Sequence, residues 1–149
     1  LVKSNQDGAM GLYQVPSLTS LATGPWQPLW SGEGRELEKW RLFAGYTVLQ
    51  YRKAGDDWLD VLDAGGKLTH SLPLTEGAGT AWIQGAHDPA SQQILIRRQG
   101  MAEAPHQRWL DLASGQWQAA DKPVANPLYR SERRWVVGKD GVRVPVSLV

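Results

Sequence analysis

The chain has 149 residues, 16 basic and 15 acidic side chains, no cysteine and a net charge of +1. Because its charges are interspersed and nearly balanced, it lacks the basic surface that binds nucleic acids or anionic membranes, and we expect neither partner. No apolar run approaches the roughly 20 residues of a membrane helix, and without cysteine there is no thiolate metal site or disulfide framework. A chain of this length can bury one ordinary core.

Short strands recur along the chain at a regular spacing. A β-branched strand centred on Val2 returns at Val48 and again at Ile94, each 46 residues after the previous one. Each copy is followed by a second strand, at residues 12–15, 58–62 and 109–112, and by a third, near residues 26–30, 67–71 and 116–119. Residues 37–43 and 80–84 are the candidates for a remaining strand that precedes the Val48 and Ile94 copies.

A period in the mid-forties with about four short strands in each unit is typical of β-propeller blades. We therefore predict an all-β, antiparallel propeller fragment, with about two full blades and part of a third. The blades are expected near residues 1–31, 36–74 and 79–122, within a partial propeller at 1–128. An array without ring closure leaves apolar faces and sheet edges open, so we also expect self-association.

Two tryptophans open the second strand of successive units. Trp58 and Trp109 each begin a Trp-Leu-Asp triplet that ends at Asp60 and Asp111. Because large aromatic side chains fill the space between blades well, we predict inter-blade packing for Trp58 and Trp109. A surface that stacks sugars or bases is the alternative for the tryptophans.

The sequence offers no catalytic or metal-binding group. No serine lies in the Gly-x-Ser-x-Gly turn that exposes a hydrolase nucleophile. His70, His87 and His106 are isolated from one another and lack the local spacing of a zinc site, so we predict surface or turn histidines. We assign no catalytic residue, no metal and no cofactor.

The last segment, residues 129–149, predicts a β-hairpin. Asp140-Gly141 favours a type I′ turn, because both residue types tolerate positive φ. After the turn, apolar side chains alternate with others, which predicts a strand with one apolar face at Val142, Val144, Val146 and Leu148. Nothing in the sequence is an evident partner for this face.

This hairpin carries a family resemblance. Lys139-Asp140-Gly141 followed by Val-Pro-Val-Ser-Leu-Val, and the preceding Tyr-Arg-Ser-Glu that starts at Tyr129, resemble the prolyl oligopeptidase family of serine peptidases, and oligopeptidase B enzymes most of all. Residues 4–13 also resemble a propeller hairpin of that family. The resemblance implies that residues 129–149 link the propeller to a missing α/β-hydrolase domain, which would hold the catalytic Ser, Asp and His.

The resemblance also implies a function and a location for the chain within its parent protein. The parent would hydrolyse short peptides, after basic residues as in oligopeptidase B, and the non-catalytic propeller would cover the active site and exclude folded proteins. The charged run Arg130, Glu132, Arg133 and Arg134 is either a solvated face or the mark of an interdomain hinge, for which Arg130, Glu132 and Arg134 are the candidate residues. The partners expected are the hydrolase domain and an oligopeptide substrate.

Two functional alternatives and two compartments remain open at this point. A stand-alone propeller-type module that binds a protein or a carbohydrate would also fit the repeat, whereas a small complete β-sandwich fits the 46-residue period poorly. The absence of cysteine fits a reducing compartment, so we expect a cytoplasmic protein, with the periplasm as the alternative.

Overall fold

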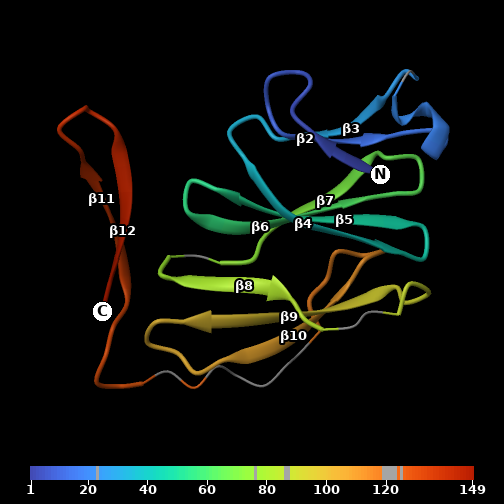
Figure 1. Ribbon diagram of the computed structural model, residues 1–149. Helices are drawn as coiled ribbons and strands as arrows, with labels where there is room; N and C mark the ends of the chain where they lie inside the picture. Colours follow the sequence, from blue (N-terminus) through green and yellow to red (C-terminus); the bar gives the residue numbers. More distant parts are fainter. Residues whose placement is uncertain (23, 76, 86–87, 119–123, 125) are drawn as a thin grey trace.

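The computed structural model describes residues 1–22, 24–75, 77–85, 88–118, 124 and 126–149 (Figure 1). Within these residues the chain forms strands joined by short turns, and one short 3-10 helix, η1. The elements are β1 (Val2–Ser4), β2 (Gly11–Gln14), η1 (Leu18–Leu21), β3 (Gln27–Ser31), β4 (Glu36–Phe43), β5 (Tyr46–Lys53), β6 (Asp56–Leu62), β7 (Leu68–Pro73), β8 (Gly79–Ile83), β9 (Gln93–Gly100), β10 (His106–Asp111), β11 (Glu132–Val137) and β12 (Arg143–Leu148).

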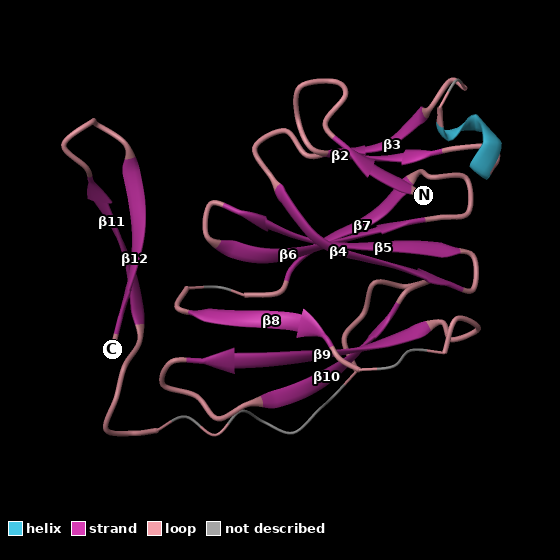
Figure 2. Cartoon of the chain, in the orientation of Figure 1, coloured by secondary structure: helices cyan, strands magenta, loops and turns pink. Residues whose placement is uncertain are grey.

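The strands form four sheets in which every neighbouring pair is antiparallel (Figure 2). The first sheet has the order β1-β2-β3, the second β4-β5-β6-β7 and the third β8-β9-β10, and β11 and β12 form the terminal hairpin. The first three sheets are stacked in chain order, with the terminal hairpin to one side (Figure 1). The prediction of an antiparallel, almost purely β chain is confirmed.

The central strands of the second sheet, β5 and β6, are buried on both faces, and this explains the sequence of β5. Successive side chains of a strand point to opposite faces, and Val48 and Leu49 belong to two different core clusters. Val48 packs towards the third sheet, whereas Leu49 and Tyr51 pack towards the first. Fully burying one such aliphatic side chain contributes about 1.5–3 kcal/mol, so both neighbours stabilise the second sheet.

The turn at Asp140-Gly141 is not the predicted type I′ turn. In the terminal hairpin the Gly138 amide donates to the Val142 carbonyl at 2.7 Å, and only Gly141 of the three loop residues has positive φ. This is a three-residue loop that ends in a left-handed glycine. The two-residue loop between β5 and β6 has positive φ at both of its residues, Ala54 (51°) and Gly55 (87°), as a type I′ turn requires.

The register of the sheets corrects the alignment of the two Trp-Leu-Asp triplets. The 46-residue repeat aligns two cross-strand pairs, Val48 with Val61 and Ile94 with Leu110. Trp109, one residue before Leu110, therefore corresponds to Asp60 and not to Trp58. Trp58 packs against the cluster between the first and second sheets, whereas Trp109 is 44% exposed and outside both clusters. Inter-blade packing of Trp109 stays a prediction.

Candidate functional site

A buried carboxylate joins the first sheet to the second. Asp60 of β6 is 1% exposed and accepts four hydrogen bonds. The Trp30 indole N–H (3.0 Å) and an Arg35 guanidinium N–H (3.2 Å) donate to Oδ2, and the hydroxyls of Tyr51 (3.1 Å) and Ser71 (2.7 Å) donate to Oδ1. A buried charge is tolerated when it is paired and its oxygens are satisfied. We call this contact between the first and second sheets the first seam.

Arg35 and Asp60 also contact the aromatic side chains of the first seam. The guanidinium of Arg35 lies 4.3 Å from the Trp30 ring centre and 5.3 Å from that of Tyr51, a cation–π geometry. Burial raises the pKa of the Tyr51 hydroxyl, and the negative charge of Asp60 adds to this effect. The hydroxyl therefore stays protonated well above neutral pH and keeps donating to Asp60.

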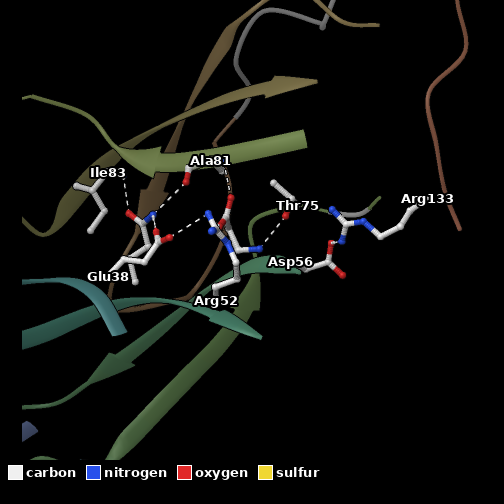
Figure 3. Close-up of polar contacts among 9 residues, drawn as sticks. Glu38, Arg52, Asp56, Thr75, Ala81, Ile83 and Arg133 are labelled. Carbon is white, nitrogen blue, oxygen red and sulfur yellow. Dashed lines mark hydrogen bonds and ion pairs between the residues drawn. The ribbon is translucent and has the colours of Figure 1, made fainter. Parts of the chain in front are cut away.

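The second seam, between the second and third sheets, uses side chains to bind the open edge of β8 (Figure 3). The Gln50 side chain, 1% exposed, donates to the Ala81 carbonyl at 3.1 Å and accepts from the Ile83 amide at 3.2 Å. Asp57 Oδ2 accepts from the Ala81 amide at 2.8 Å. A strand edge presents unpaired N–H and C=O groups, and here two side chains from the neighbouring sheet satisfy them.

A charged chain continues from this seam across the second sheet (Figure 3). Arg52 lies 2.9 Å from Glu38 and 3.4 Å from Asp57, and Glu38 also accepts from the Gln50 amide at 2.9 Å. The Asp57 amide donates to the Thr75 hydroxyl at 2.9 Å. The carboxylates of Asp57 and Glu38 thus share one cation, Arg52.

The terminal hairpin contacts the second sheet at the β5–β6 turn. Arg133 of β11 forms an ion pair with Asp56, the first residue of β6 (Figure 3). On β12, Pro145 lies so close to Gly55 that a Cβ added there would stand 3.1 Å from its Cγ. The Asp56 side chain is 32% exposed, against 2% for Asp60 and 3% for Asp57, so solvent reaches this carboxylate more than it reaches those of the seams, whereas the Arg133 side chain is 11% exposed.

Two of the predicted hinge residues, Glu132 and Arg134, lie on the opposite face of β11 from Arg133, and the third, Arg130, precedes the strand. Glu132 is 2.7 Å from Arg134 and 3.8 Å from Arg130, and the two arginine side chains are 66% and 86% exposed. The structure joins these three residues to one another. Their role as an interdomain hinge stays a prediction. Arg133, which the sequence analysis placed in the same charged run but not among the hinge candidates, reaches the second sheet.

The face that carries Glu132 and Arg134 also carries exposed apolar side chains. Cross-strand pairing places Val136 and Val144 on this face, together with Val146 and Leu148. Val136 is 51% exposed, Val144 47% and Leu148 39%. The apolar face predicted for this strand is therefore present, and it points away from the contact with Gly55.

Of the histidines that the structure describes, His70 lies within β7 and His106 is the first residue of β10. The His70 Nε2 atom is 3.1 Å from the Ala113 carbonyl oxygen, which joins β7 to the turn after β10, and His106 is near the Ala104 carbonyl. His87 lies outside the described residues. Among those described, no group of three or more acidic or histidine side chains could hold a metal ion. Nor does any helix there have the length and apolarity to cross a membrane.

Known proteins resemble this chain in structure. No family model matches it and no curated protein does. One solved structure, from an analysis of two prolyl endopeptidases, matches at 18% identity with a TM-score of 0.73 over 96% of the chain. Prolyl oligopeptidase B from Galerina marginata matches at 15% identity and 0.71, and oligopeptidase B from Trypanosoma brucei, in a closed form with covalently bound antipain, at 20% and 0.68, each over 97% of the chain.

These similarities establish the fold. The sheets are blades of a β-propeller like that of the prolyl oligopeptidases, as the strand repeat predicts. The resemblance noted in the sequence is therefore matched by the structure. The chain spans 21–22% of the length of these enzymes.

Proposed function

We propose that this chain is the non-catalytic propeller segment of a serine peptidase of the prolyl oligopeptidase family. The observation that carries the proposal is the match of 96–97% of the chain to prolyl endopeptidases, prolyl oligopeptidase B and oligopeptidase B. In this role the segment covers the active site of a hydrolase domain and admits short peptides. The Tyr129–Glu132 sequence supports an oligopeptidase B-like parent that cleaves after basic residues.

The seams supply a physical reason for exclusion of folded proteins. A peptide filter must keep its shape while substrates pass, and each seam here joins neighbouring blades through buried, satisfied polar groups. Opening the first seam would leave the Asp60 charge without its donors, and opening the second would leave the β8 edge unpaired. Each loss costs about 1–3 kcal/mol or more, so the blades move together as one body.

The terminal hairpin is the proposed connection to the hydrolase domain. One of its faces contacts the β5–β6 turn through Arg133 and Pro145, and its other face exposes Val136, Val144 and Leu148. Exposed apolar side chains grouped on one face favour contact with another protein surface. The hydrolase domain is the partner that we propose for this face, with the charges of Arg130, Glu132 and Arg134 beside it.

The test uses the full-length protein that contains this chain. It should react with a fluorophosphonate probe, which labels activated serines. It should also hydrolyse a short peptide after Arg or Lys much faster than it cleaves a folded globular protein. The isolated 149-residue chain is the matched control and should show neither labelling nor hydrolysis. Absence of labelling in the full-length protein would contradict the peptidase and favour a stand-alone binding module. Labelling of the isolated chain would contradict the non-catalytic role.

A further inference from the structure

The arginines of the third sheet differ from those of the second in their partners. Arg52 is paired with carboxylates, as described above. In the part of the chain that the structure describes, Arg97, Arg98 and Arg108 have no carboxylate within ion-pair distance. Arg108 instead lies 4.9 Å from the Trp117 ring centre. The third sheet thus carries cationic groups that no described acid neutralises.

Two of these arginines line a cavity at the second seam. The cavity has a volume of about 320 Å³ and its walls come from β7, β9, β10 and the segment after β10. Its lining residues are Pro73, Leu74, Ile96, Arg98, Arg108 and Trp117. It therefore combines two guanidinium groups with an apolar floor and an indole wall, and none of the described residues that line it is acidic.

The strand register explains how the two guanidinium groups come together. Arg108 pairs directly with Ile96 across β9 and β10, and Arg98 follows Ile96 by two residues, so all three side chains share one face. Within the described residues, the Arg98 Nε atom is buried and has no hydrogen-bond partner. An unsatisfied buried donor costs about 1–3 kcal/mol, which an acceptor bound in the cavity would recover.

We propose that this cavity binds a small carboxylate with an apolar or aromatic body. The planar guanidinium group matches the two oxygens of a carboxylate, and Trp117 holds that of Arg108 in place. The body of the ligand would contact Leu74 and Ile96. The volume lies at the lower end of the range for small-molecule sites. This inference does not depend on the proposed peptidase function.

The ligand could be a free organic acid or the C-terminal carboxylate of a peptide, which share this chemistry. Benzoate is the probe for the first and N-acetylphenylalanine for the second. Binding is followed on the ¹⁵N-labelled 149-residue chain through the indole N–H resonance of Trp117, which is assigned with Trp117→Phe. We expect saturable shifts with benzoate and none with benzyl alcohol, which has the same ring without the charge.

Substitutions at neighbouring arginines separate the site from general charge. Arg108→Gln should weaken benzoate binding about tenfold or more, because it removes a charge-assisted hydrogen bond. Arg97→Gln is the matched control: it removes the same charge from the opposite face of β9, where Arg97 lies 5.8 Å from the Trp82 ring centre, and should leave the affinity unchanged. Arg108→Lys keeps the charge and loses the planar group, so its affinity for benzoate should lie between those of Arg108→Gln and Arg97→Gln.

Several results would overturn the proposal. Equal shifts with benzoate and benzyl alcohol would show that charge is not recognised, and equal losses in Arg108→Gln and Arg97→Gln would show that the cavity is not the site. Displacement of benzoate by an equal concentration of inorganic phosphate would contradict the role of the apolar floor. A peptide C-terminus would be identified as the source if N-acetylphenylalanine bound at least as well as benzoate and N-acetylphenylalanine amide, which lacks the carboxylate, did not bind.

Discussion

Two adjacent carboxylates at the start of β6 have different partners. Asp57 is 2% exposed and accepts from the backbone of β8, within the seam between two blades. Asp56, whose side chain is 32% exposed, pairs with Arg133 of the terminal hairpin. Because successive residues of a strand point to opposite faces, one dipeptide serves two interfaces.

The difference between the two carboxylates is one of solvent access. Loss of a partner from a buried charge leaves that charge uncompensated and typically costs 3–5 kcal/mol, as a rough figure. An ion pair that solvent reaches contributes about 0–1 kcal/mol. We therefore expect the seams to hold the blades together permanently, and the hairpin contact to open at little cost. Three substitutions test this contrast.

The largest effect is expected at the first seam. Asp60→Ala removes the acceptor for Trp30, Arg35, Tyr51 and Ser71, so the free energy of unfolding should fall by at least about 3 kcal/mol. Urea unfolding followed by circular dichroism measures this change. Glu36→Ala, which removes an exposed carboxylate from β4, is the control and should change stability by less than about 0.5 kcal/mol. Equal effects of the two substitutions would refute the special role of the seam.

A smaller loss is expected at the second seam. Gln50→Met keeps the length of the side chain but leaves the Ala81 carbonyl and the Ile83 amide without their partner. The free energy of unfolding should fall by about 2 kcal/mol, and the Ile83 amide should exchange faster with solvent deuterium. If exchange at Ile83 matched that of the unchanged chain, the Gln50 side chain would not be what protects the β8 edge.

The smallest effect on overall stability is expected at the hairpin. Asp56→Asn should lower the free energy of unfolding by less than about 1 kcal/mol, while amide exchange of β11 and β12 rises. High salt should raise exchange in the unchanged chain in the same strands, because it screens the partly exposed pair of Asp56 and Arg133. Asp57→Asn, the control at the neighbouring residue, should instead raise amide exchange in β8. A loss at Asp56 as large as that at Asp57 would remove the distinction between the two contacts.

The repeat and the strand pattern were predictable because they depend on local alternation. Strands that bury one or both faces can be recognised in the sequence by their β-branched and aromatic residues, as around Val48 and Ile94. The match between Trp58 and Trp109 was wrong for a physical reason. The register is set by hydrogen bonds along the whole strand. These bonds pair Ile94 with Leu110 and Val48 with Val61, so the second triplet lies two places further along its strand than the first does.

The seams were out of reach of sequence reasoning. Gln50 meets Ala81 and Ile83, more than thirty residues away, and nothing near Gln50 in the chain marks it as the partner of a strand edge. Arg133 was grouped with the other charges of its run although a signal separates it: alternation places it on the other face of β11 from Glu132 and Arg134. The turn at Asp140-Gly141 was assigned from residue type alone, whereas its loop length depends on the pairing of Gly138 with Val142.

The turn at Ala54 and Gly55 determines how closely the terminal hairpin approaches the second sheet. Left-handed backbone costs an L-residue about 1–2 kcal/mol, and Ala54 adopts it at φ 51°. Gly55 has no Cβ, so Pro145 rests directly on its backbone, and a methyl group there would stand 3.1 Å from the proline ring. Gly55→Ala would therefore push the hairpin away from the blade by a few tenths of an ångström, and would also strain the backbone of residue 55 at its positive φ.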